Sequence, residues 1–249
     1  MVKGGRYFTG ILLIFFLSGS TFPPIQAQEP SYPDIFGDNW TKARQFVADN
    51  QSWMRLKCAQ FRVDYPLAVS MVFPELIRYS ALRDRMEITL LKTLYTYKGS
   101  EYSDFSVGVF QIKPSCAEAV LRSLSERDER KLYRHFYQIY HSLPVREFRS
   151  SVVRELEDPV SGFLYVIAII KILDRLYSST RWESRDEMIR FYAAAYNSGF
   201  LGGEKHIRSM MEEHAFHTGM RKPGKCFSYP GISAAFYHLM SNPDFYKED

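Results

Sequence analysis

One carboxylate, Glu75, stands alone in an apolar stretch, and its surroundings suit a group that transfers protons. The stretch reads LAVSMVFPELIRYS over Leu67–Ser80, and in a helix Glu75 would lie one turn after Met71 and Val72. An apolar setting disfavours the charged carboxylate, so such a group can keep its proton near neutral pH and act as a general acid. Pro74, which lacks an N–H, should bend or break this helix. The alternative is that Pro74 starts a new helix and Glu75 only interacts with the positive end of its dipole.

Two later stretches supply hydrogen-bonding groups. Ser106–Pro114 reads SVGVFQIKP, in which the glycine permits a close backbone approach or a positive φ and the Gln111 amide can both donate and accept hydrogen bonds. Phe191–Gly199 reads FYAAAYNSG and places a tyrosine and an asparagine at the C-terminus of a predicted helix, where side chains can point into a cleft. Each stretch also has a purely structural interpretation, as a polar loop before a helix and as a buried tyrosine beside a glycine cap.

Helices must position these three stretches. Asp64 is a candidate N-cap for the helix of the first stretch. Asp158, followed by a proline, opens a segment that is apolar nearly all round as far as Leu176, which predicts a buried central helix. Ser184 and Glu187 form a capping-box pattern before the third stretch. Because capping signals and helical periodicity recur while alternating runs are few, the sequence predicts an all-α fold with at most a small hairpin.

The remaining segments are interpreted from the same patterns. Gln28–Gly37 has few core-forming residues and predicts a flexible lead-in, whereas Trp40–Leu56 has a moderate helical pattern that fits two short helices. Ile77–Tyr97 and Ala117–Tyr140 are rich in helix-forming and charged residues, and the second of these predicts two helices. A short helix is expected near Ala234–Met240.

The start of the chain predicts export. Residues 1–27 contain no acid, place Lys3 and Arg6 before the apolar run Gly10–Leu17, and end at Ala27, which is the pattern of a secretory signal peptide. The run is shorter than the ~20 apolar residues that a membrane span needs, so no stable span is expected after cleavage. We therefore expect residues 28–63 to form a lead-in and helical extension, residues 64–249 to form the main domain, and the protein to work in the periplasm or cell envelope.

Composition and motifs give no sign of several other classes of protein. The formal net charge of the chain is +4, with acids and bases interspersed and no basic block, so nothing indicates nucleic acid as a partner. The six histidines are scattered; His214 and His217 are three apart and could share a helix face, but without further ligands at metal spacing no metal site is predicted. No Gly-rich phosphate loop or dinucleotide fingerprint is present in the sequence.

Cysteine usage fits an exported protein. The three cysteines are Cys58, Cys116 and Cys226. Export permits disulfides, and an odd count suggests one pair and one free thiol. The expectation is that Cys58 or Cys226 pairs with Cys116; the sequence does not decide between them.

In their order along the chain, the three stretches resemble the lytic transglycosylases that cleave bacterial cell-wall glycan, in the lysozyme superfamily. That family usually shows a Glu at a helix end, then GxxQ with a Pro three residues on, then AYN followed by a Gly. This chain has Glu75, then Gly108 to Pro114, then Ala195–Gly199, and the resemblance covers Asp64–Gly199. Two features depart from the pattern. Leu76 stands where the family usually has Ser, and the longer gap before the glycine indicates an insertion around Ala81–Ser100.

The resemblance implies an all-α lysozyme-like domain that cleaves the MurNAc-GlcNAc β-1,4 bond of peptidoglycan with a single acid and no cofactor. Glu75 would protonate the leaving oxygen and then take a proton from the muramic acid C6 hydroxyl, leaving a 1,6-anhydro sugar. The residues that would line the cleft and bind the glycan strand are Ser106, Gln111, Tyr196 and Asn197.

Two alternatives remain open from the sequence. A muramidase-type hydrolase normally needs a second carboxylate, for which Glu101 and Asp104 are the candidates. A non-catalytic glycan-binding or envelope-scaffold protein could also be built on the same fold.

Overall fold

The computed structural model of the protein describes residues 31–81, 86–218 and 226–242, so the predicted signal peptide, residues 1–27, lies outside the described residues. Across these ranges every regular element is a helix, and the only bridges are two isolated antiparallel ones, between Val107 and Ile112 and between Phe216 and Phe227. The prediction of an all-α fold is therefore confirmed. The helices are α1 (Tyr32–Phe36), α2 (Asp38–Phe61), α3 (Tyr65–Ala81), α4 (Met86–Lys98), α5 (Pro114–Ser123), α6 (Glu126–Tyr140), α7 (Val145–Glu157), α8 (Pro159–Leu176), α9 (Arg185–Ser198), α10 (Glu204–Met211) and α11 (Tyr229–Ser241).

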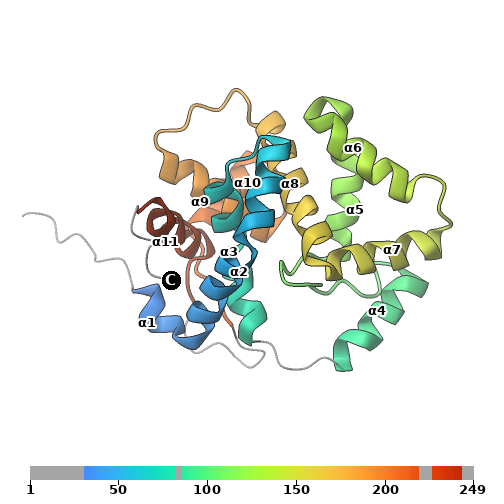
Figure 1. Ribbon diagram of the computed structural model, residues 1–249, viewed down its shortest axis with the longest axis horizontal. Helices are drawn as coiled ribbons and strands as arrows, with labels where there is room; N and C mark the ends of the chain where they lie inside the picture. The colour runs from blue at the N-terminus through green and yellow to red at the C-terminus, as the bar shows by residue number, and fades with distance from the viewer. Residues whose placement is uncertain (1–30, 82–85, 219–225, 243–249) are drawn as a thin grey trace, which may run out of the picture. The chain divides into compact units, whose positions relative to one another are not determined.

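The described residues form one compact unit, in which the helices make two groups joined by α8. In the first group α3 contacts α2, α9 and α11, and α10 contacts α9 (Figure 1). In the second group α7 contacts α4 and α5. Helix α8 contacts members of both groups, among them α2, α3 and α9 on one side and α5, α6 and α7 on the other. Helix α2, which lies in the predicted extension of residues 28–63, packs along α3 of the predicted main domain, residues 64–249.

Helix α8 is the buried central helix that the sequence predicts. Asp158 is its N-cap and accepts a hydrogen bond of 2.7 Å from the Ser161 N–H, with Pro159 as the first helical residue. Every residue from Gly162 to Ile170 is buried. Since burying a large apolar side chain contributes about 1.5–3 kcal/mol, this helix is a main source of stability and a rigid support for the elements on either side.

Helix α3 continues through Pro74. The predicted break at this proline is therefore wrong. Residues 67–77 are all buried, so tertiary packing holds both halves of the helix although one backbone hydrogen bond is missing. The Phe73 ring stacks on the Phe236 ring of α11 with 3.5 Å between centroids, and Trp40 of α2 meets Phe73 edge-on at 4.8 Å. This packing fixes the helix that carries Glu75 on two sides.

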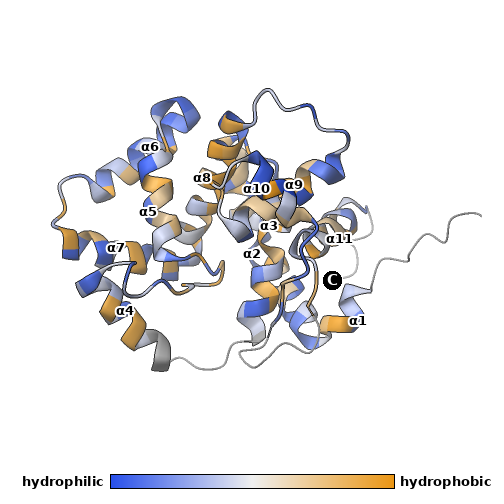
Figure 2. Cartoon of the chain, turned by 180° about the vertical axis from the view of Figure 1, so that it is seen from behind, coloured by the Kyte–Doolittle hydropathy of each residue, from blue (hydrophilic) through white to orange (hydrophobic). Residues whose placement is uncertain are grey.

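Several other boundaries differ from the predicted ones. Helix α1 occupies part of the predicted flexible lead-in, and α2 is a single helix of 24 residues instead of two short helices. Helix α4 lies within the stretch predicted as an insertion, and α11 is longer than the predicted Ala234–Met240. The predicted pair of helices after Ala117 is confirmed as α5 and α6. Figure 2 colours most of α6 as hydrophilic, and its few buried side chains, Leu132 and Phe136, face the core.

The predicted capping box before α9 forms only in part. Ser184 Oγ accepts a hydrogen bond of 3.0 Å from the Glu187 N–H, as expected. Glu187 Oε2, however, accepts from the Glu183 N–H at 2.6 Å and not from the N-cap residue. Glu187 also pairs with Arg208 of α10 at 2.8 Å, so its carboxylate joins the start of α9 to the next helix.

The predicted disulfide is wrong, because all three cysteines are free thiols. Cys58 is buried on α2, Cys116 lies on α5, and Cys226 is exposed just before α11. Burial raises the pKa of the Cys58 and Cys116 thiols to about 12, so both stay protonated and unreactive.

His214 and His217 do not share a helix face, since both lie in the irregular segment after α10. The described residues contain no group of His, Cys, Asp and Glu side chains that could hold a metal ion. Within the same residues, no helix combines the length and the apolar character needed to cross a membrane.

Candidate active site

The five residues predicted to form a site line one cavity. It has a volume of about 370 Å³ and lies between α3, the loop that precedes α5, α5 itself and the C-terminal end of α9. This volume is within the usual range of small-molecule and substrate sites. The predicted residues in its wall are Glu75, Ser106, Gln111, Tyr196 and Asn197.

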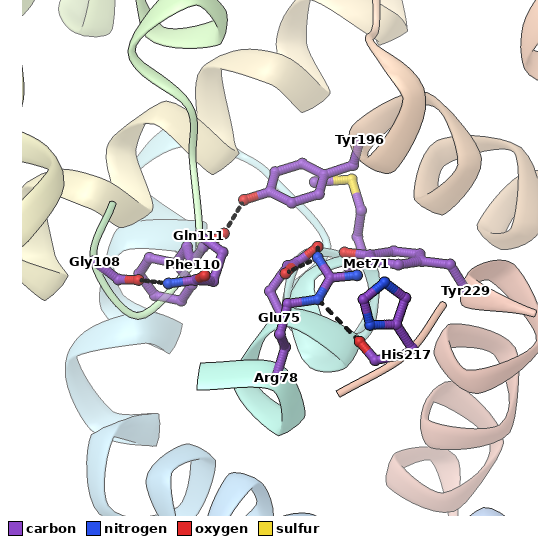
Figure 3. Close-up of polar contacts among 9 residues, drawn as sticks. All are labelled: Met71, Glu75, Arg78, Gly108, Phe110, Gln111, Tyr196, His217 and Tyr229. Atoms are coloured by element: carbon purple, nitrogen blue, oxygen red, sulfur yellow. Dashed lines mark hydrogen bonds and ion pairs between the residues drawn. The ribbon is translucent and has the colours of Figure 1, made fainter. Parts of the chain in front are cut away.

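Glu75 projects from α3 into the wall of this cavity and is only 4% exposed. Its two carboxylate oxygens accept hydrogen bonds of 2.9 and 2.7 Å from Nη1 of Arg78, one helical turn further on (Figure 3). Burial raises the pKa of Glu75 to about 7, against the opposing effect of the Arg78 charge and of hydrogen bonds from Arg78 and Tyr229. Near neutral pH both forms of the carboxyl group are therefore populated, which suits a group that first gives and later takes a proton.

Arg78 is a site residue that the sequence analysis missed. Its guanidinium lies 4.7 Å from the centre of the Phe216 ring, and its Nε donates to the His217 carbonyl oxygen at 3.4 Å. Arg78 therefore links α3 to the segment that follows α10. The Glu-x-x-Arg spacing on one helix face was a signal that could have identified the pair, since residues three apart are neighbours on a helix surface.

Tyr229 is a second residue that the sequence did not reveal. It begins α11, and its buried hydroxyl lies 3.1 Å from the Met71 carbonyl oxygen and also within reach of the Glu75 carboxylate (Figure 3). The hydroxyl has one proton, so it donates to one of these acceptors at a time. Burial and the charge of Glu75 raise the pKa of Tyr229 well above its ordinary value, so it remains a donor.

Tyr196 lies at the end of α9 and is drawn above Glu75 in Figure 3. Its hydroxyl donates to the Phe110 carbonyl oxygen at 2.8 Å, which ties α9 to the loop before α5. Burial, followed by the charge of Glu75, raises the pKa of Tyr196 well above its ordinary value. Gly199 ends the helix with φ +108°, and its N–H donates to the Ala195 carbonyl oxygen at 3.0 Å. Asn197, in the last turn of the helix, is exposed at the cavity rim.

The loop before α5 is shaped by two residues with positive φ, Gly108 at +69° and Gln111 at +51°. A Cβ on Gly108 would lie 1.9 Å from the Leu156 carbonyl oxygen, so only glycine fits there. Both predicted properties of this glycine, the close approach and the positive φ, are confirmed. Gln111 Nε2 donates to the Gly108 carbonyl oxygen at 2.8 Å, so the amide nitrogen stabilises its own turn and the amide oxygen remains as an acceptor.

The two candidate second carboxylates lie in different settings. Asp104 lines the cavity, but its oxygens accept hydrogen bonds from the Ser115 N–H at 3.1 Å and the Ser115 hydroxyl at 2.9 Å. Lys113 Nζ lies 3.7 Å from the same carboxylate. These contacts cap the start of α5, which is a structural role. Glu101 is exposed in the turn after α4 and does not line the cavity.

No known protein family, no curated protein and no solved structure compared with this chain matches it. The resemblance to lytic transglycosylases therefore depends on the three sequence stretches alone.

Proposed function

We propose that the protein is a peptidoglycan lytic transglycosylase, a lyase that cleaves the MurNAc-GlcNAc β-1,4 bond and leaves 1,6-anhydroMurNAc ends. The observation that carries this proposal is the buried Glu75 carboxyl group, with a pKa raised to about 7, in the wall of a cavity shared by all three motif stretches. A glycosidic oxygen leaves readily only when it is protonated, so a carboxyl group that keeps its proton near neutral pH is the first requirement.

In the proposed reaction the protonated Glu75 gives its proton to the bridging oxygen, and the bond between that oxygen and C1 of MurNAc breaks. The acetamido group of the substrate stabilises the positive charge at C1. The Glu75 carboxylate then takes the proton of the C6 hydroxyl, and the C6 oxygen bonds to C1. The carboxyl group returns to its starting form, and the step consumes neither water nor a cofactor.

The groups around Glu75 support both halves of this cycle. After the first transfer the carboxylate is stabilised by the hydrogen bonds from Arg78 and by the Tyr229 hydroxyl. The Gln111 amide oxygen and the exposed Asn197 side chain are the groups that would bind the glycan at the cavity wall. The site of action, the periplasm or cell envelope, is part of the same proposal and follows from the predicted signal peptide.

The position of Asp104 in the same cavity favours one second candidate, a muramidase-type hydrolase. In that mechanism a second carboxylate acts as nucleophile or activates water. Both Asp104 oxygens are already hydrogen-bonded to Ser115, which leaves this carboxylate less free to act on a substrate or a water molecule.

The test is release of soluble fragments from purified cell walls. Glu75→Gln keeps the shape of the side chain but cannot transfer a proton, and general acid–base catalysis contributes typically ~10² to 10⁴-fold in rate. We expect that loss for Glu75→Gln, a smaller loss for Asp104→Asn, and none for the matched control Glu101→Gln. Near-normal cleavage by Glu75→Gln would refute the proposal. Tight glycan binding without cleavage by the wild type would favour a non-catalytic glycan-binding protein.

A further inference from the structure

The Glu75 carboxyl group is surrounded by polar groups from several elements, and among the described residues the cation bonded to it is Arg78. Arg78 contributes both hydrogen bonds from α3 itself. Lys113, the other cation in the cavity wall, lies beside Asp104 instead. Among the described residues, the titratable groups near Glu75 or in the cavity wall include Tyr229 of α11, Tyr196 of α9, Cys116 of α5, and Asp104 and Lys113 before α5. The segment after α10 adds His217, whose carbonyl oxygen accepts a hydrogen bond from Arg78.

Arg78 is held in place by a part of the chain that lies beyond the three motif stretches. Phe216 and Phe227 exchange two backbone hydrogen bonds of 2.9 Å, which closes a short antiparallel bridge. The Phe216 ring lies under the Arg78 guanidinium and also meets the Phe36 ring at 5.9 Å and the Tyr229 ring at 5.8 Å, both edge-on. The bridge therefore connects α1 and α11 to the arginine that bonds to Glu75.

We propose that Arg78, fixed by the Phe216–Phe227 bridge, is a positioning residue that orients the Glu75 carboxyl group and sets the pH range over which it holds its proton. The effect of Arg78 on catalysis rests on the proposed function, whereas its effect on the protonation of Glu75 does not. Nη1 contacts both carboxylate oxygens, so the side chain of Glu75 has one preferred orientation in the cavity wall.

The direction of the effect follows from the two opposing influences on Glu75. Burial disfavours the carboxylate, and the Arg78 charge favours it. An opposite charge within hydrogen-bonding distance lowers the pKa of a carboxyl group by about 1–3 units, so its removal should raise the pKa by a similar amount. Without Arg78, the carboxyl group would keep its proton well into the alkaline range.

The experiment is a titration of the Glu75 carboxyl carbon by NMR, with no substrate present. The wild type should show a midpoint near 7, and Arg78→Gln should show a midpoint higher by about 1–3 pH units. Arg78→Lys, which keeps the charge but cannot match the guanidinium geometry, should show a smaller rise. The matched control is Arg208→Gln. Like Arg78, Arg208 pairs with acidic side chains and lies over aromatic rings, but it is not part of the wall of this cavity.

Two further measurements keep the inference distinct from the proposed function. Phe216→Leu removes the ring under the Arg78 guanidinium while the backbone bridge can still form. It should raise the Glu75 midpoint in the same direction, and it tests the support of Arg78 if Arg78→Gln does not fold. In the cell-wall assay, the pH at which activity falls on the alkaline side should be higher for Arg78→Gln than for the wild type. The difference should equal the change in the NMR midpoint of Glu75.

If the Glu75 midpoint is higher in Arg78→Gln than in the wild type, and the wild type cleaves no glycan, the result would support the inference and count against the proposed function. Unchanged midpoints in the folded Arg78 and Phe216 variants would overturn the inference, whatever the activity.

Discussion

The buried carboxyl group of Glu75 should make the stability of the protein depend on pH in a way that Glu75→Gln removes. The pKa of Glu75 rises from 4.5 to about 7 on folding. Between these values the unfolded chain has lost the proton while the folded chain keeps it, so the wild type becomes less stable as the pH rises. Above about 7 both states carry the charge and the loss is complete. Gln has no proton to lose, so the variant does not show this dependence.

The size of the effect follows from linkage. Each pH unit over which the folded and unfolded chains differ by one proton changes the unfolding free energy by about 1.4 kcal/mol, which gives about 3 kcal/mol between pH 4 and 8. Glu75 is almost inaccessible to water, so screening by solvent does not reduce this figure. Glu75→Gln also removes the carboxylate that pairs with Arg78. Because the guanidinium stays charged between pH 4 and 8, this loss changes the unfolding free energy of the variant by the same amount at every pH.

The assay is urea unfolding followed by circular dichroism, for the wild type and Glu75→Gln, at several values between pH 4 and 8. Other titrating groups contribute to both proteins and cancel in the difference of their unfolding free energies. We expect this difference to change by about 3 kcal/mol in favour of the variant as the pH rises. A difference that stays constant, or one that changes in favour of the wild type, would refute the raised pKa and with it the case for Glu75 as a proton donor.

Three further predictions concern the cavity and the core. Gly108→Ala should destabilise the protein by about 2–4 kcal/mol in urea unfolding, because the new Cβ meets the Leu156 carbonyl oxygen and φ is positive; wild-type stability would contradict the close approach. Tyr196→Phe should lose about 1–2 kcal/mol, since it leaves the Phe110 carbonyl oxygen without its donor; the same unfolding assay checks this, and no loss would mean that the hydrogen bond is absent. Thiol titration of the unfolded, unreduced protein should find all three cysteines free; finding only one would restore the disulfide expected from the sequence.

Features that depend on local signals could be predicted from the sequence. Asp158 with the proline after it, and the apolar segment that follows, define α8 without reference to the rest of the chain. The positive φ of Gly108 and the end of α9 at Gly199 are local in the same sense. The predicted site residues line one cavity. Their meeting was expected from the family resemblance of the three stretches and not from local signals.

Features that depend on tertiary packing could not be predicted. Pro74 was expected to interrupt α3, yet packing by α2 and α11 holds the helix together. Tyr229 reaches Glu75 from α11, and no local pattern relates the two positions. The Phe216–Phe227 bridge that supports Arg78 is likewise a long-range contact. The expected disulfide was wrong because a count of cysteines contains no information on where the thiols lie.

The most direct test of the central claim, that Glu75 alone cleaves the glycan without activating water, is a digest of purified peptidoglycan in water labelled with heavy oxygen. Mass spectrometry of the soluble fragments then shows how each new end was made. We expect fragments that are lighter by one water than hydrolysis products and that carry no label, with none released by Glu75→Gln. Fragments with one labelled oxygen at each new reducing end would contradict it and would show that water, activated by a second group such as Asp104, takes part in the reaction.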